Sequence, residues 1–327
     1  MELILRSASV LFLGASASAQ TALLRVGDPA PGGASGQSVI AIHHTAVNQS
    51  AGFAASIEVG NSTTSISQFW GHFSGGASSV LRSEAMIGNV RQTSFDGEFG
   101  LSSAAIAYSG KSDELPWFFY RDSLWLDDML IGLEGSFSGA LSTFFASCSK
   151  AGVTETADLY YLGGGGPSRG IYYGMSPTTI VRVGDVLPNL PAPLSTAVVS
   201  SGPGFGFSSH GAHNIVNVDL EGSADVDGAM SIDGAGLLLG GSIVREGDWV
   251  PPSVGGVSGE VWDDFGYVGI TESGNYMFTG DTNVTSGFIV RSGSIWARAG
   301  DQLGGAVLAG PVKDAYLNEN DQLAFIW

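Results

Sequence analysis

Arg25-Val26-Gly27-Asp28 is the first of four closely similar segments in this chain of 327 residues. The other three are Arg182-Val183-Gly184-Asp185, Arg245-Glu246-Gly247-Asp248 and Arg298-Ala299-Gly300-Asp301. Two degenerate copies, Met86-Ile87-Gly88-Asn89 and Leu130-Ile131-Gly132-Leu133, divide the long gap, so that the glycines lie 61, 44, 52, 63 and 53 residues apart. A repeat of this length predicts an array, a solenoid or a propeller.

The recurring aspartates have two interpretations. Asp accepts hydrogen bonds from nearby backbone N–H groups in turns, and the glycine beside it tolerates a positive φ. We therefore expect Asp28, Asp185, Asp248 and Asp301 to stabilise turns. A ring of carboxylates that binds cations is the alternative.

A second motif recurs between these segments. Its copies are Asn318-Glu-Asn-Asp321-Gln-Leu-Ala324-Phe325, Thr271-Glu-Ser-Gly274-Asn-Tyr-Met277-Phe278 and Asn48-Gln-Ser-Ala51-Gly-Phe-Ala54-Ala55. A polar residue opens the motif, a small or turn-forming residue follows, and apolar residues continue it. This order predicts a tight hairpin turn that leads into a half-buried strand.

The two motifs together resemble a family of secreted bacterial tandem-repeat proteins that is named for the pattern N-x-x-G-x-x-A-F. The resemblance covers most of the chain after its first residues and is closest in the final copy, where Asp321 stands in place of the glycine. It implies a repeated propeller-like fold and an export signal, and it implies no enzymatic activity.

The two ends of the chain each supply an incomplete repeat. Five full units lie between the six glycines, residues 21–26 form a strand without a hairpin, and Val312–Trp327 form a hairpin without a closing strand. Joining the two ends removes the open edges of the sheets. We therefore predict an all-β fold, a six-bladed antiparallel β-propeller closed by pairing of the N-terminal strand with the C-terminal hairpin, as one domain over residues 20–327. A linear β-solenoid is the alternative.

The composition restricts the function. The 49 glycines suit a turn-rich all-β protein. The formal net charge is −18 and no two Lys or Arg residues are adjacent, which disfavours nucleic acid as a partner. Cys148 is the only cysteine, so no disulfide forms within the chain, and we expect a buried thiol. We expect a monomer.

The N-terminal residues are typical of a secretory signal peptide. Arg6, a short apolar stretch and Ala17-Ser18-Ala19 predict cleavage after Ala19, with residues 1–19 removed and the protein extracellular or periplasmic. An ordinary first strand is the alternative. The sequence predicts no helix that spans a membrane.

Candidate ligand-binding residues gather around one loop. Trp249 and Trp262 flank Pro251–Glu260 and lie beside Asp263 and Asp264, so this is where we expect a carbohydrate to stack, if one binds. Paired carboxylates for glycoside hydrolysis could come from the same region or from a second set of acids. That second set is Asp127, Asp128 and Glu134.

The densest acidic run, Asp219–Asp233, is interpreted as a solvated loop. Calcium binding by Asp225, Asp227 and Asp233 is the alternative, because hard oxygen ligands alternate along calcium loops. Two histidine pairs, His43-His44 and His210-Gly211-Ala212-His213, lack a nearby third ligand for a metal. No cofactor-binding motif is predicted.

The function predicted from the sequence is that of a secreted, non-enzymatic binding or structural protein. A propeller presents loops on a flat face, and a glycan or an extracellular protein is the expected partner. We expect contact at the loops that vary most between units, which are Gly60–Ser79, Gly110–Pro116, Gly163–Ser168 and Pro251–Gly259. The alternative is a carbohydrate-active hydrolase or lyase on the same scaffold.

Overall fold

The computed structural model describes most of the chain. The described residues are 9–13, 22–32, 35–48, 50–61, 63–75, 77–84, 86–87, 90–92, 95, 99–114, 120–138, 143–199, 204–223, 226–303 and 305–327. Within them the secondary structure is almost entirely antiparallel strands, with two short 3-10 turns, η1 (Gly166–Ser168) and η2 (Pro252–Val254). None of the helical segments in these residues is long and apolar enough to cross a membrane.

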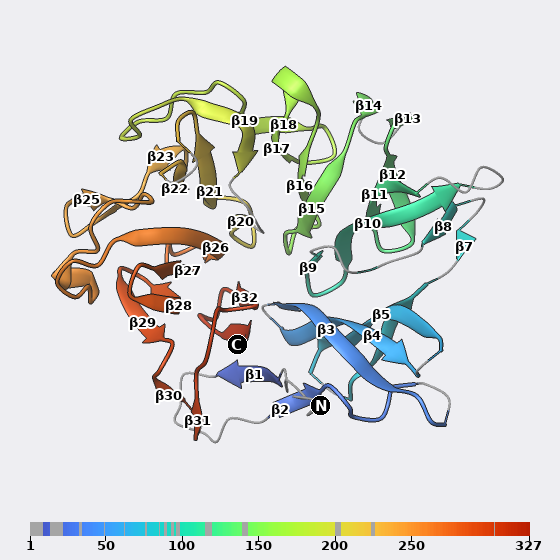
Figure 1. The fold of residues 1–327 in the computed structure, drawn as a ribbon. Coiled ribbons are helices and arrows are strands. Elements are labelled where there is room, and N and C mark those ends of the chain that lie inside the picture. Colours follow the sequence, from blue (N-terminus) through green and yellow to red (C-terminus); the bar gives the residue numbers. More distant parts are fainter. Residues whose placement is uncertain are drawn as a thin grey trace.

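The sheets are arranged around a ring, as in a propeller (Figure 1). Blade one contains β3 (Ser38–Val47), β4 (Ala51–Gly60), β5 (Ser65–Ser74) and β6 (Ser79–Ser83). Blade two contains β7 (Met86–Ile87), β8 (Val90–Gln92), β9 (Phe99–Leu101), β10 (Ile106–Glu114), β11 (Tyr120–Leu126) and β12 (Met129–Leu133). Blade three contains β15 (Cys148–Val153), β16 (Leu159–Gly163), β17 (Gly170–Tyr173) and β18 (Thr178–Arg182).

The ring continues with two further blades and three short hairpins. Blade four contains β19 (Leu194–Val199), β20 (Phe205–Phe207), β21 (Asn214–Leu220), β22 (Gly228–Ile232) and β23 (Ala235–Gly236). Blade five contains β26 (Trp262–Ile270), β27 (Tyr276–Thr282), β28 (Thr285–Arg291) and β29 (Ser294–Arg298). The hairpins are β13 (Ser136–Ser138) with β14 (Thr143–Phe145), β24 (Leu238–Leu239) with β25 (Ser242–Ile243), and β30 (Gln302–Leu303) with β31 (Ala306–Val307).

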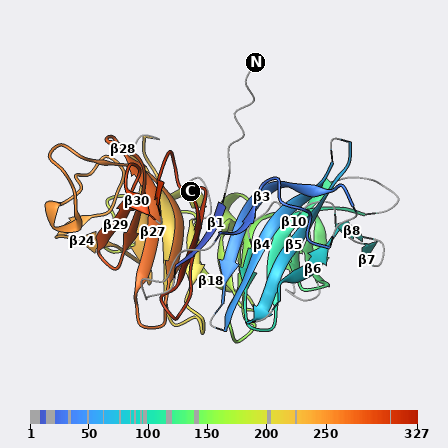
Figure 2. The same cartoon turned by 90° about the horizontal axis from the view of Figure 1, so that it is seen from below.

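The all-β class and the propeller-like arrangement of antiparallel sheets are confirmed. Five blades, rather than the predicted six, are each built from a continuous segment of the chain. One more sheet, which we call the end sheet, is built from both ends of the chain in the order β2 (Ala22–Arg25), β1 (Ser9–Leu13), β33 (Leu323–Ile326) and β32 (Asp314–Leu317). Seen at right angles to the ring, the long strands of the blades run through its thickness (Figure 2).

The predicted pairing of the two ends is wrong in one detail. We expected residues 21–26 to pair directly with the C-terminal hairpin. Instead β1, which lies inside the predicted signal peptide, pairs with β33 on one side and with β2 on the other. An edge strand leaves unpaired N–H and C=O groups, and here β1 pairs with those of β33, so that β2 lies at the outer edge of the sheet.

The four close copies of the first motif form the same turn. Their glycines have φ between 78° and 100°, and the Asp N–H donates to the Arg carbonyl oxygen three residues earlier at 3.0–3.1 Å. The Asp side chain accepts the Arg backbone N–H in three copies, at 2.8–2.9 Å, and accepts the guanidinium in the fourth. The prediction that these aspartates stabilise turns is confirmed.

Each of these turns also joins one sheet to the next. The glycine N–H donates to the carbonyl oxygen of a downstream residue, and that residue's N–H donates to the Asp carbonyl oxygen. The downstream residues are buried, and they are Val39, Leu194, Trp262 and Leu308. The turn therefore fixes where the chain begins its next inner strand, or, in the last copy, the segment that leads to that strand.

One degenerate copy was placed wrongly. Gly132 lies inside β12, opposite Leu124, and forms no turn. Gly135, three residues later, has φ of 73° and donates its N–H to Phe145 at 2.8 Å, as the other turn glycines donate to their partners. The other degenerate copy, at Gly88-Asn89, lies outside the described residues.

The core lies between neighbouring sheets. A separate group of buried apolar side chains fills each junction, and one of them, between blades four and five, includes Trp262, Phe265, Phe278 and Phe288. Burial of such aromatic side chains contributes about 1.5–3 kcal/mol each. Junctions of this kind also connect the end sheet to blade five and to blade one, where Ala324 packs on Val47 and Phe53.

Candidate ligand-binding channel

A cavity lies on the axis of the ring. It is lined by residues of β3, β9, β15, β20, β26 and β32, the innermost strands of the five blades and the end sheet, and by Tyr160 of β16 (Figure 1). The cavity itself is narrow, about 40 Å³, and it opens to solvent. Because every sheet of the ring contributes to one wall, this is the place where a ligand could contact all of them at once.

The wall of the cavity combines aromatic rings with two charged groups. Phe99, Tyr160, Phe205 and Tyr267 are among the rings. The ammonium of Lys150 lies 4.8 Å from the centre of the Phe205 ring, which is within the range of a cation–π interaction. The chain has three lysines, so the presence of one on the axis is informative in a protein with a net charge of −18.

The carboxylate of the cavity belongs to Asp314 at the start of β32. Its side chain is buried, and it accepts hydrogen bonds from the backbone N–H of Thr45 and from the Thr45 hydroxyl, the latter at 2.9 Å. This contact joins the end sheet to blade one. Tyr316, two residues further along β32, is half-buried, and burial raises its pKa.

A ring of polar turns surrounds the other end of the channel. Every inner strand ends at a buried polar residue whose side-chain oxygen accepts a backbone N–H three to five residues later, at 2.7–3.1 Å. These residues are Asn48, Ser102, Thr154, Ser208, Thr271 and Asn318. The second motif of the sequence therefore occurs six times, although only three copies could be recognised from its letters.

Neighbouring polar turns are connected by hydrogen bonds between sheets. Three of the connections use glutamates that follow the turn residue. Glu155 accepts the Ser103 N–H at 2.7 Å, Glu272 accepts the His210 N–H at 2.7 Å, and Glu319 accepts the Glu272 N–H at 2.6 Å. Glu155 and Glu319 line a second, smaller cavity at this end of the channel.

The remaining junctions use amides and backbone groups. Asn318 donates to the Asn48 carbonyl oxygen at 2.7 Å, Asn48 donates to the Ser102 carbonyl oxygen at 2.9 Å, and the Glu155 N–H donates to the Ser209 carbonyl oxygen at 2.8 Å. Hydrogen bonds thus connect all consecutive sheets at this end, including the end sheet to blade one.

One of the four residues predicted to bind a ligand is buried, and the other three are exposed. Trp262 is 1% exposed in the core, which corrects the prediction that its ring is available for stacking. Trp249 is 49% exposed. Asp263 and Asp264 are also exposed, but neither lines the axial cavity or the second cavity. Burial and then Asp263 raise the pKa of Asp264, while the Phe265 N–H opposes this rise.

The predicted calcium ligands are separated. Asp225 lies outside the described residues. Asp227 contacts Glu246, whereas the Asp233 carboxylate lies 2.7 Å from Nδ1 of His213. Among the described residues, no group of three or more His, Cys, Asp or Glu side chains is arranged to hold a metal ion. Calcium binding stays a prediction.

The acids considered for hydrolysis are engaged elsewhere. Asp127 and Asp128 pair with Arg82 at 3.1 and 3.2 Å, and Glu134 accepts the Asp122 N–H at 3.1 Å. Cys148 is buried, as expected, and burial raises the pKa of its thiol.

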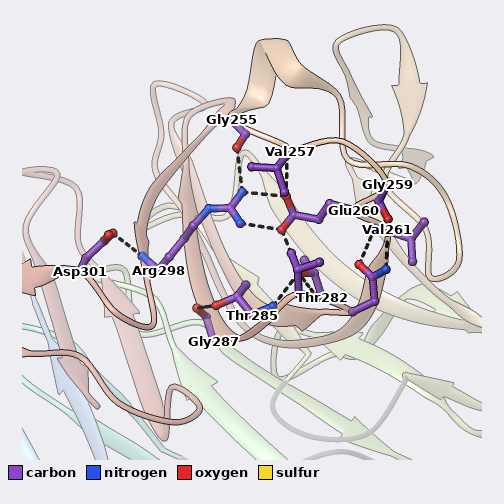
Figure 3. A network of polar contacts seen from close by, with 12 residues as sticks. Gly255, Val257, Gly259, Glu260, Val261, Thr282, Thr285, Gly287, Arg298 and Asp301 are labelled. Carbon is purple, nitrogen blue, oxygen red and sulfur yellow. Dashed lines mark hydrogen bonds and ion pairs between the residues drawn. The ribbon is translucent and has the colours of Figure 1, made fainter.

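The loop between Pro251 and Glu260 is fixed from within blade five (Figure 3). Arg298 forms an ion pair with the fully buried Glu260 at 2.6 Å and donates to the Gly255 carbonyl oxygen at 2.7 Å. Burial alone would raise the pKa of Glu260, but hydrogen bonds from Arg298, Val257 and Thr282 outweigh it and keep the pKa below its ordinary value. In the sequence, only the repeated arginine pointed to this pair.

The chain matches no protein-family model and no curated protein sequence. Among solved structures, the WD40 β-propeller domain of Doa1 is similar at 9% identity and a TM-score of 0.39, over 90% of this chain and 98% of that one. PorZ, described as an essential bacterial surface component of the type-IX secretion system of Porphyromonas gingivalis, is similar at 12% identity and a TM-score of 0.26. That match covers 88% of this chain and 40% of PorZ.

Proposed function

We propose that this protein is a secreted, non-enzymatic binding protein whose six-bladed ring contacts a glycan or an extracellular protein at the mouth of the axial cavity. The propeller scaffold is the part that the strand order establishes. We propose, in addition to this scaffold, the compartment, the number of functional blades, the ligand and the absence of catalysis.

The end sheet acts as the sixth blade in this proposal. It supplies an inner strand, β32, to the axial cavity, as each of the five continuous blades supplies one. It also carries a polar turn at Asn318 and is hydrogen-bonded to both neighbours at the end of the channel. These three properties are those of a blade. All of them belong to the C-terminal hairpin, so they remain when residues 1–19, which include β1, are removed.

The observation that carries the binding function is the wall of the axial cavity. Concave sites with apolar walls and a few convergent polar groups are the usual ligand sites of proteins. Here Lys150 and Asp314 come from different sheets and face the same space as the aromatic rings of Phe205 and Tyr267.

The non-enzymatic part of the proposal follows from the carboxylates around the channel. Among the described residues that line the axial cavity, Asp314 is the one carboxylate, and it accepts hydrogen bonds from Thr45. In the second cavity, Glu155 and Glu319 accept backbone N–H groups. Glycoside hydrolysis needs two carboxyl groups that face one sugar, so a hydrolase is the less favoured alternative.

A glycan array with the purified chain tests this function, run beside turnover assays on the same polysaccharides. We expect binding that weakens at least about tenfold in Lys150→Met, because a hydrogen bond to a charged group contributes about 1.5–3 kcal/mol. Lys111→Met is the matched control, since Lys111 pairs with Asp122 on blade two and its side chain is 56% exposed. Binding that survives in Lys150→Met would place the site away from the channel, and turnover would favour the enzyme.

Export has its own test. Arg6, the apolar stretch and Ala17-Ser18-Ala19 support removal of residues 1–19. Mass spectrometry of the exported protein should give an N-terminus at Gln20, or within about two residues of it. A mature protein that retains Met1 would contradict export by this route. The resemblance to secreted tandem-repeat proteins supports the same expectation.

A further inference from the structure

Glu246 is an exception within the first motif. The second residue of the other three close copies is Val26, Val183 or Ala299, and in the third copy it is a glutamate. This glutamate is 4% exposed. A buried carboxyl group loses its hydration, so it needs partners that the apolar residues of the other copies do not need. Glu246 must therefore find these partners among its neighbours.

Gly228 provides both a partner and the space. Its N–H donates to Oε2 of Glu246 at 2.9 Å, and its carbonyl oxygen accepts the Glu246 N–H at 2.9 Å. A Cβ atom on residue 228 would lie 2.1 Å from Oε1 of Glu246, so the glutamate carboxyl group would have to move to admit it. The glycine at the start of β22 is thus matched to the glutamate.

The charges that act on Glu246 from other segments are both negative. Asp227, immediately before β22, is hydrogen-bonded to Glu246 through its side chain, and Asp264 acts from β26 of blade five. On its own segment, the Arg245 guanidinium pairs with Asp248 at 2.8 Å. Two carboxyl groups can form a hydrogen bond to each other only when one of them carries a proton.

Burial, Asp264 and Asp227 together raise the pKa of Glu246 to about 7, and the Gly228 N–H acts in the opposite direction. In the unfolded chain this pKa is about 4.5. The folded protein therefore binds the proton more tightly than the unfolded chain does. The stabilising contribution of the protonated group is fully present below pH 4.5 and is lost as the pH rises through 7.

We propose that the buried Glu246 carries a proton at the junction of blades four and five, and that loss of this proton above neutral pH loosens the junction. The next residue shows how. Gly247 donates its N–H to Trp262 at 2.8 Å and thereby holds the start of β26. Repulsion of the Glu246 carboxylate from Asp227 and Asp264 acts on the residue beside this hydrogen bond.

The test is the thermal unfolding of the full chain between about pH 5 and pH 8.5, a range that spans the titration. We expect the wild-type Tm to fall across this range by at least about 3 °C more than the Tm of Glu246→Gln, which cannot ionise. Glu221→Gln is the matched control, because it removes the same charge from an exposed position. It should keep the wild-type dependence on pH.

A local measurement separates this junction from the rest of the molecule. Hydrogen exchange at the Gly228 amide should accelerate above pH 7 beyond the intrinsic increase in the wild type and should not do so in Glu246→Gln. Equal pH dependence of Tm in the wild type and Glu246→Gln would overturn the proposal. A second result would also overturn it: calcium raises the Tm of the wild type at pH 8.5 but does not raise the Tm of Glu246→Gln. Glu246 and Asp227 would then share a cation instead.

Discussion

At the scale of single residues, the arginines of the first motif differ in their energetic roles. Arg298 pairs with the fully buried Glu260, and its own side chain is 20% exposed. Arg182 pairs with Asp185 at 3.6 Å with 64% of its side chain exposed. Both arginines occupy the same position of the motif. Without its arginine, Glu260 would be a buried unpaired charge, whereas Asp185 would remain hydrated.

Arg298→Met should therefore lower the free energy of unfolding by about 3–5 kcal/mol, whereas Arg182→Met should lower it by less than about 1 kcal/mol. Urea unfolding of both variants at pH 7 measures the difference. Equal losses would show that the Arg298–Glu260 pair acts as a surface pair.

The same pair gives a dependence on pH that is opposite in sign to that of Glu246. The pKa of Glu260 is lower in the folded protein than its ordinary value of 4.5, so its stabilising contribution is present above pH 4.5 and is lost as the pH falls through the folded value. Arg298→Met should remove this loss at acidic pH, and the same unfolding series at pH 3–5 shows whether it does.

At the scale of elements, the end sheet determines whether the ring is closed. β2 lies at its outer edge and β33 is paired on both sides. Deletion of residues 20–27 removes β2 together with the turn that leads to Val39, so it should lower the Tm of the whole domain. Differential scanning calorimetry of this deletion measures the effect. An unchanged Tm would mean that closure does not depend on the N-terminal residues.

Much of this level could be predicted from the sequence. The Asp and Gly residues of the first motif specify a turn by their own chemistry, so the repeat and the all-β class were visible. Gly135 was missed because its turn lacks the Arg and Asp that mark the others, and Gly132 was chosen because an apolar strand precedes it. The exposure of Trp262 could not be predicted, because a tryptophan before an inner strand has the same local pattern in a core and on a surface.

The candidate site was harder to predict than the fold. Lys150, Asp314 and Tyr267 lie far apart in the sequence, and only the curvature of the ring brings them to one cavity. Neither lysine nor aspartate recurs at the corresponding position of other inner strands, so no repeat pattern marks them. The predicted site around Asp263 and Asp264 relied on residues that are close in the sequence, and this is a weak guide to which side chains converge in a propeller.

At the scale of the whole molecule, the polar turns at the end of the channel mean that the blades are not interchangeable parts. Glu319 accepts N–H groups from Ser209 of blade four and from Glu272 of blade five, so its two carboxylate oxygens serve two different blades. A blade that was duplicated or exchanged by recombination would arrive without the backbone groups that its neighbours require. Growth of such a ring by copying one unit must therefore be followed by paired changes on both sides of each new junction, which accounts for repeats that share their turns and little else.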